Sequence, residues 1–420
     1  MKKQQIYGDE IFKFVLKNGL PVTFVQKPGF STFQMSISVL FGGADVTISD
    51  NHQENIPIPA GTAHFLEHKM FEKESGDLML EFDRLGADSN AFTNSDITSY
   101  YFHSANKENF SQLTETLFNL VYNPYFTDES ILKEREIIGQ EIDRSLDDPY
   151  SMLFRGAFQN LYGDLGLSRE VLGTKETIST ITPNLLYFIH KKIYTPKNMT
   201  LFFAGDFSLE EVESTLEKFS PTSIQEKKQV ALIQETGLLS TYKGSSSHGN
   251  TSENITSLFL RVDKNKLSVE HKVATEIVLE VFFGESSSWQ QKNYEAGSIN
   301  DDFEFGFELG REYGYLIFIQ RASVDSAKFE KIILDNFSNV HLEGFEEEFT
   351  RVKNAKLGAT IMSFDQISNI ATPPEEFDLN LDTYSLTKIL ETMDITTAFK
   401  KFREVISDTK KVRYSVLPKK

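Results

Sequence analysis

Two histidines and a glutamate lie close together in the segment His64-Phe65-Leu66-Glu67-His68. Residues four positions apart share one face of a helix, so the imidazoles of His64 and His68 can point at a common atom. Paired imidazoles are typical zinc ligands, and a carboxylate beside a zinc ion can accept a proton from water. The segment therefore predicts a zinc site that activates water, with Glu67 as the proton acceptor.

The surroundings of this segment favour a buried site over a pair of solvated histidines on a helix surface. A helix with apolar flanks packs closely, and buried imidazoles and carboxylates need hydrogen-bond partners or a metal. The order H-x-x-E-H reverses the commoner H-E-x-x-H and is itself a metallopeptidase signature. The apolar flanking residues are Ala63, Phe65, Leu66, Met70 and Phe71.

A third zinc ligand is expected in residues 127–148, which predict a long helix. Thr127 is a typical N-cap, and Pro149 follows the expected end. Burying a carboxylate is costly unless it is paired or binds a metal, so acids on an apolar stripe are candidate ligands. The alternative is a solvated amphipathic face, and spacing alone does not choose between the two acids. The stripe consists of Ile131, Glu134, Ile138 and Glu141.

These residues resemble the pattern of the insulinase and pitrilysin metallopeptidases, including mitochondrial-processing-peptidase-like proteins. In that family, H-x-x-E-H is followed some seventy-odd residues later by a Glu ligand, which has another Glu seven positions before it. Glu134 and Glu141 match both features. The resemblance implies one zinc ion per chain, bound by His64, His68 and Glu141. It also implies that Glu67 is the general base and that Glu134 orients a ligand.

The segment from Leu85 to Thr93 is similar to the family's Gly-Ala…Asn-Ala-x-Thr segment. In relatives this segment is an edge strand that pairs with the substrate backbone. The sequence itself also fits an ordinary β-strand after a helix. The resemblance implies a substrate-binding strand formed by Asn90, Ala91, Phe92 and Thr93.

The resemblance is strong from about residue 10 to residue 220 and weaker beyond. Residues 172–174, 194–199 and 204–206 also follow the family pattern. Many relatives carry an Arg and a nearby Tyr in the second half that grip the substrate. The matching stretch here, residues 294–300, has neither residue in place. We therefore expect a chain with complete zinc chemistry and an incomplete substrate grip.

Composition limits the class of protein. The chain has 420 residues, 36 phenylalanines and a net charge of −18. This length predicts two or more domains, and the acidity argues against nucleic-acid binding. Residues 1–20 contain no apolar run and no stretch reaches eighteen apolar residues, so we expect neither a signal peptide nor a membrane span. The absence of cysteine fits a cytoplasmic protein.

Strands first, then helices, then a further strand predict an α+β fold with antiparallel-rich sheets. Residues 220–254 are rich in polar residues and glycine, after which the order of elements restarts. We predict a zinc-binding catalytic domain at 1–225, a linker at 226–252 and a homologous non-catalytic domain at 253–420. The resemblance implies two α/β sandwich domains that form one half of a clamshell chamber.

The expected function is that of a zinc-dependent endopeptidase acting on unfolded peptides. Family chambers contain four homologous domains, so a second subunit is implied. It is either a zinc-less homologous chain in a heterodimer or a second copy in a homodimer. One alternative is a non-catalytic scaffolding subunit of the same fold, and another is a zinc hydrolase of small amides.

Overall fold

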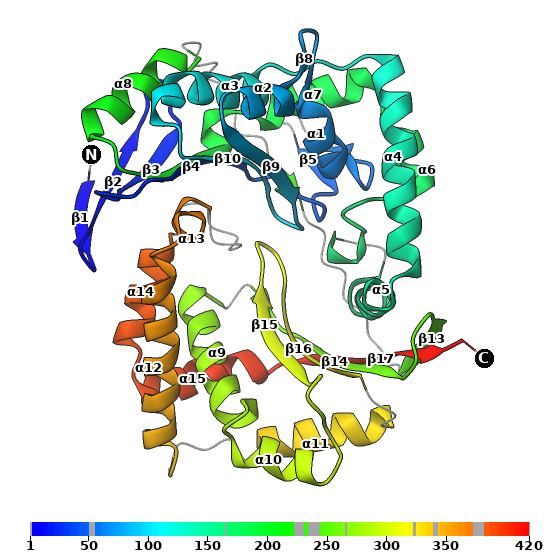
Figure 1. Ribbon diagram of the computed structural model, residues 1–420. Helices are drawn as coiled ribbons and strands as arrows, with labels where there is room; N and C mark the ends of the chain where they lie inside the picture. Colours follow the sequence, from blue (N-terminus) through cyan, green and yellow to red (C-terminus); the bar gives the residue numbers. More distant parts are fainter. Residues whose placement is uncertain are drawn as a thin grey trace. The chain divides into compact units, whose positions relative to one another are not determined.

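The computed structural model describes residues 2–49, 55–163, 166–221, 231–233, 244–264, 267–321, 325–338, 343–372 and 382–419 (Figure 1). The chain forms two compact units, and each unit combines segments from both halves of the sequence. Unit 1 consists of Met1–Ile142, Arg169–Gln234 and Ile361–Tyr384. Unit 2 consists of Asp143–Ser168, Glu235–Thr360 and Ser385–Lys420.

Unit 1 contains a seven-stranded sheet in the order β1-β2-β3-β11-β4-β10-β9. All neighbours are antiparallel except β3 and β11, which are parallel. A smaller sheet pairs β12 (Ala231–Ile233), β5 (Thr47–Ser49) and β6 (Asn55–Pro57), and β7 (Glu72–Lys73) pairs with β8 (Gly76–Asp77). The large sheet comprises β1 (Lys2–Ile6), β2 (Asp9–Val15), β3 (Pro21–Gln26), β4 (Phe33–Val39), β9 (Ala87–Thr93), β10 (Thr98–Ser104) and β11 (Met199–Gly205).

Side-chain alternation along β4 explains how the two faces of this sheet are used. Phe33, Met35, Ile37 and Val39 are buried in the main core beneath the helices, which cover one face of the sheet in Figure 1. The intervening residues are polar and face the other side. The helices that lie wholly or mainly in unit 1 are α1 (Thr62–Met70), α2 (Leu78–Arg84), α3 (Phe110–Tyr122), α4 (Asp128–Asp147), α6 (Lys175–Ser179), α7 (Pro183–Ile193), α8 (Leu209–Phe219) and α13 (Ile367–Ala371).

A segment from the second half of the chain covers part of the polar face. Helix α13 packs on β4 and β11. The hydroxyl of Ser36 donates to the carbonyl of Ala371 at 2.5 Å. Tyr384 donates to Asp9, whose carboxylate also accepts both of the 2.9 Å bonds from Lys27. Unit 1 is therefore completed by residues that lie more than three hundred positions away in sequence.

Unit 2 contains a five-stranded sheet in the order β13-β17-β14-β16-β15. Its pairing pattern repeats that of β3-β11-β4-β10-β9: the first pair is parallel and the other three are antiparallel. This match agrees with the predicted repetition of one fold. The strands are β13 (Ser245–Gly249), β14 (Ile255–Arg261), β15 (Glu304–Leu309), β16 (Gly314–Arg321) and β17 (Lys410–Pro418).

Helices pack on the sheet of unit 2 as well. Helix α5 lies against β17, where a Cβ atom on Gly156 would overlap the ring of Tyr414, so glycine permits the close approach. Helix α9 packs on β15 and on α15. The remaining helices follow in order: α5 (Pro149–Tyr162), α9 (Val269–Phe283), α10 (Ser288–Glu295), α11 (Ser326–Ser338), α12 (Glu346–Ser363), α14 (Thr383–Thr392) and α15 (Ile395–Ile406). Single 3-10 turns lie at Lys107–Asn109, Gly166–Ser168 and Pro196–Asn198.

The predicted fold class is confirmed, since both sheets are antiparallel-rich and packed with helices. The predicted domains at 1–225 and 253–420, joined by a linker at 226–252, stay a prediction. Residues 226–230 and 234–243 of that linker lie outside the described part of the chain. None of the described helices is long and apolar enough to cross a membrane.

Candidate metal centre

Helix α1 carries two stripes of different chemistry. Phe65, Leu66 and Lys69 are completely buried or nearly so, whereas His64, Glu67 and His68 are only partly buried. The buried stripe, which is apolar except for Lys69, packs the helix on β9 and β10. The polar stripe is thereby held in a fixed orientation toward α4.

Two glycines fix the start of α1. Gly61 precedes the helix with φ of 87°, a left-handed conformation that suits glycine. A Cβ atom there would lie 2.6 Å from the carbonyl oxygen of Leu172, and one on Gly173 would lie 2.5 Å from that of Ala60. The close contact between these two segments places His64 at the first turn of the helix. Gly173 belongs to the residues 172–174 that match the family pattern.

His64, His68 and Glu141 form a cluster whose ligand atoms all lie within 4.8 Å of one another. Oε2 of Glu141 is 3.7 Å from Nε2 of His64 and 3.8 Å from Nε2 of His68. In a tetrahedral zinc site with bonds of about 2.1 Å, two ligand atoms lie roughly 3.4 Å apart, which is close to these separations. The donor set of two imidazoles and a carboxylate therefore fits a divalent metal. It is the only such cluster found among the described residues.

The electrostatics of the two histidines differ. Burial, with the neighbouring His68, lowers the pKa of His64 to about 3, so its imidazole is neutral and suited to metal binding. For His68, burial also acts to lower the pKa, but the hydrogen bond and charge of Glu134 and the charge of Glu141 outweigh it and raise the pKa. These anionic neighbours favour a positive charge beside His68, which a divalent cation supplies.

Glu134 contacts the ring nitrogen of His68 that faces away from Glu141. Oε1 of Glu134 lies 2.9 Å from Nδ1 of His68. This contact favours a hydrogen on Nδ1 and leaves the lone pair on Nε2 for a metal. Burial would raise the pKa of Glu134, but the hydrogen bond and charge of His68 and the charge of Lys69 lower it. Glu134 is therefore placed as a carboxylate against His68, and its predicted role in orienting a ligand stays a prediction.

Glu67 is held by a threonine from the neighbouring strand. The hydroxyl of Thr93 donates to Oε2 of Glu67 at 2.6 Å, and Thr98 lies 3.3 Å from the same hydroxyl. Burial raises the pKa of Glu67, and the Thr93 hydrogen bond opposes that rise only in part. A carboxylate with a raised pKa beside a metal site is suited to accept a proton from water.

Strand β9, which contains the predicted substrate-binding residues, is at the edge of the large sheet among the described strands. It pairs with β10 on one side. Asn90 is exposed, while Ala91, Phe92 and Thr93 are partly buried. The structure thus brings Thr93 to Glu67 and leaves the other three along an accessible edge. Their role in substrate binding stays a prediction.

Sequence reasoning missed two features of this centre. Thr93 was expected to bind substrate only through the strand, whereas its side chain bonds Glu67. Lys69 follows His68 directly and lies on the buried stripe of α1. The sequence did contain a signal for this burial, because Lys69 lies four residues after Phe65 and three after Leu66 and so shares their helix face.

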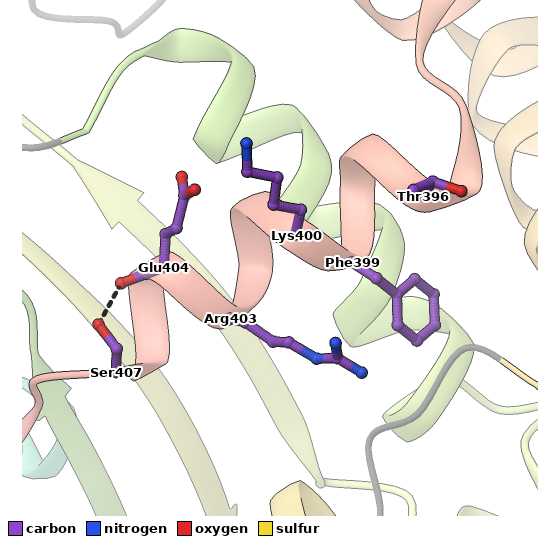
Figure 2. A pocket seen from close by; sticks show the side chains of 6 residues that line it. All are labelled: Thr396, Phe399, Lys400, Arg403, Glu404 and Ser407. Carbon is purple, nitrogen blue, oxygen red and sulfur yellow. Dashed lines mark hydrogen bonds between the residues drawn. The ribbon is translucent and has the colours of Figure 1, made fainter.

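A cavity of about 380 Å³ along α15 in unit 2 has a different character. Figure 2 shows that Lys400 and Arg403 leave the helix in different directions, and the only bond drawn joins Ser407 to the carbonyl of Glu404. These side chains do not converge on a common point, so this cavity carries no comparable site. Its lining residues are Thr396, Phe399, Lys400, Arg403, Glu404 and Ser407.

A helix that carries the H-x-x-E-H motif, a carboxylate from a second helix beside it and an adjacent edge strand are the arrangement of a metallopeptidase. Comparison with known proteins agrees. Residues 51–175 match the model of insulinase (peptidase family M16), and residues 180–356 match that of the peptidase M16 inactive domain.

Individual relatives support this assignment. The chain is 33% identical to the uncharacterized zinc protease YmfH of Bacillus subtilis, over 71% of each chain. It is 30% identical to the probable mitochondrial-processing peptidase subunit beta of Schizosaccharomyces pombe, over 55% of this chain and 49% of that one. The crystal structure of an M16-like peptidase from Alicyclobacillus acidocaldarius superposes with a TM-score of 0.87 and 25% identity, covering 99% of this chain and all of that one. The chain therefore belongs to the insulinase family, peptidase family M16.

Proposed function

We propose that this chain is a zinc-dependent endopeptidase that hydrolyses unfolded peptides in a chamber completed by a second subunit. The observation that carries the proposal is the convergence of His64, His68 and Glu141 beside Glu67, within reach of an edge strand. The name of the relative in B. subtilis, a zinc protease, supports zinc as the metal.

His64, His68 and Glu141 would hold one zinc ion through Nε2, Nε2 and a carboxylate oxygen. When bound, such an ion acts as a Lewis acid that polarises the scissile carbonyl and makes water more acidic. Glu67 takes the proton from water and delivers it to the leaving amine. Since Thr93 donates to Oε2, the other carboxylate oxygen, Oε1, is the one that carries the proton.

The substrate would bind as an extra strand along β9. Strand addition satisfies backbone groups of the peptide and reads its side chains only loosely. Asn90, Ala91, Phe92 and Thr93 lie on this edge, and Thr93 links it to Glu67. A folded protein cannot offer a free extended segment, so unfolded peptides are the substrate class this arrangement favours.

The second subunit would supply what this chain lacks. Residues 294–300 contain neither the Arg nor the Tyr that many family members use to grip substrate. We favour a zinc-less homologous partner over a second copy for this reason, and the relative from S. pombe is named as a subunit. We also propose a cytoplasmic location, on the absence of cysteine.

The proposal is tested by digestion of an unfolded peptide library and a panel of small amides, with and without zinc. Cleavage of peptides that is lost in Glu67→Gln supports an endopeptidase. A folded, zinc-loaded chain that cleaves only the small amides contradicts it. Ordinary peptidase rates from the purified chain alone would rule out the need for a different partner, and an unchanged biological function in Glu67→Gln would favour a scaffolding subunit.

A further inference from the structure

The buried stripe of α1 includes a cation. Lys69 lies on the same side of the helix as Phe65 and Leu66, and its side chain is 1% exposed. A lysine at such a position must find anionic or carbonyl partners, because an unpaired ammonium is strongly disfavoured away from water. The partners of the Lys69 ammonium are therefore expected to be carboxylates or carbonyl groups held close to it.

Two carboxylates flank the Lys69 ammonium. One belongs to Glu72, which begins β7 just after the helix, is 41% exposed and forms an ion pair with Nζ. The other belongs to Glu134, whose Oε2 lies 3.6 Å from Nζ and whose side chain is 13% exposed. The opposite oxygen of Glu134 contacts Nδ1 of His68 at 2.9 Å. The Glu134 carboxylate thus bridges a lysine and a histidine that are adjacent in sequence.

This bridge distinguishes two otherwise similar glutamates. Glu134 and Glu141 are seven residues apart on α4, which is close to two helical turns, so both side chains point toward α1. Glu141 presents Oε2 to the Nε2 atoms of both histidines. Glu134 instead contacts Lys69 through one carboxylate oxygen and His68 through the other. These two contacts oppose a rotation of the Glu134 side chain toward the metal position.

We propose that Lys69 is a positioning residue that holds Glu134 against Nδ1 of His68 and thereby sets the affinity of the site for its metal. The inference rests on the zinc site of the proposed function and extends it to a residue outside the ligand set. Lys69 acts through Glu134 and His68 and does not itself contact the metal or the substrate.

A double-mutant cycle on zinc affinity tests this role. The dissociation constant for zinc is measured by competition with a chromophoric chelator for wild type, Lys69→Met, Glu134→Gln and the double variant. Methionine has a similar length and helix propensity and suits a buried position. Loss of an outer hydrogen-bonding partner typically weakens metal binding about 10- to 100-fold. We expect Lys69→Met to weaken zinc binding about tenfold in wild type and less than about twofold in the Glu134→Gln background.

Lys73 provides a matched control in the same unit. It is also buried, but its ammonium donates to the carbonyls of Leu120 and Asn123 rather than to Glu134. Lys73→Met should leave zinc affinity unchanged. Lys69→Arg, which keeps the charge, should bind zinc more tightly than Lys69→Met. Thermal unfolding of each metal-free variant checks its fold, and Lys69→Gln takes the place of Lys69→Met in the cycle if the latter does not fold.

The outcomes separate this inference from the proposed function. Equal zinc affinity in wild type and Lys69→Met would overturn the inference alone, as would an equal loss in both backgrounds. A folded Lys69→Arg that binds zinc no more tightly than Lys69→Met would show that charge is not the cause and would also overturn it. A wild-type chain that binds no zinc would overturn the proposed function and this inference with it.

Discussion

Nδ1 of His68 lies 2.9 Å from Oε1 of Glu134, on the side of the ring opposite to Glu141. This contact gives the two glutamates of α4 different partners. Glu134 contacts Nδ1 of the imidazole, while Glu141 faces the Nε2 atoms of both histidines. This difference between Glu134 and Glu141 comes from their positions on α4 and not from residue type, because both are glutamates on one helix face.

Glu134→Gln should weaken zinc binding about 10- to 100-fold, because a neutral amide is a poorer partner for the Nδ1 hydrogen of His68. Glu136→Gln is the control, since Glu136 is exposed on the same helix. Chelator competition gives both affinities. Equal affinities for the two variants would show that Glu134 does not orient His68.

Thr93→Val should move the acidic limb of the pH profile of kcat/KM to higher pH. The Thr93 hydrogen bond favours the ionised form of Glu67 and lowers its pKa, so its removal raises that pKa further. The base must be ionised to work, and activity is then lost at a higher pH. Zinc content should be unchanged. A profile identical to that of wild type would mean that Thr93 does not tune Glu67.

His190 should make stability depend on pH. Burial is the main reason why its pKa is lowered to about 4, and Nε2 contacts the carbonyl of Val121 at 2.8 Å. The folded pKa lies below the unfolded value of about 6.5, so the full contribution is present above pH 6.5 and is lost as pH falls toward 4. The loss between pH 7.5 and pH 5 is about 2 kcal/mol.

His190→Gln keeps a donor for Val121 and removes the titration. Urea unfolding of this variant should show a weaker dependence on pH than wild type over the same interval. Parallel pH dependences for the two proteins would mean that His190 is not responsible.

Tyr384→Phe should destabilise unit 1 by about 1–2 kcal/mol, because it leaves one bond to a buried carboxylate unmade. Tyr384 donates to Asp9 at 2.5 Å and stacks on Phe364, which belongs to the same returning segment. Tyr294→Phe, at an exposed position, is the control. Thermal unfolding compares the two, and equal midpoints would show that the Tyr384 hydroxyl adds nothing.

Local patterns in the sequence were sufficient to predict much of this architecture. The turn at Asn18-Gly19 joins β2 to β3, as its composition indicates. The helix expected at 127–148 is α4, and the predicted N-cap Thr127 accepts a bond from the backbone N–H of Ser130. The proximity of His64 and His68 could be predicted because residues four positions apart lie on one face of a helix, whatever the tertiary structure.

Features that depend on tertiary structure were not predictable in this way. Spacing could not choose between Glu134 and Glu141, because the choice depends on which carboxylate faces the Nε2 atoms of both histidines, and the family resemblance supplied it. Lys69 was not among the predicted site residues, and its contacts with Glu72 and Glu134 arise only when the fold buries its side chain. The return of α13 and Tyr384 to unit 1 leaves no periodic signal in the sequence, because their contacts join distant parts of the chain.

The central claim is that His64, His68 and Glu141 form one zinc site. Elemental analysis of the purified wild-type chain and of His68→Ala, prepared in parallel, tests it most directly. We predict about one zinc per chain in wild type and little in the variant, since removal of one ligand from three leaves too few protein donors. Wild-type protein without metal, or equal zinc content in the two proteins, would contradict the account.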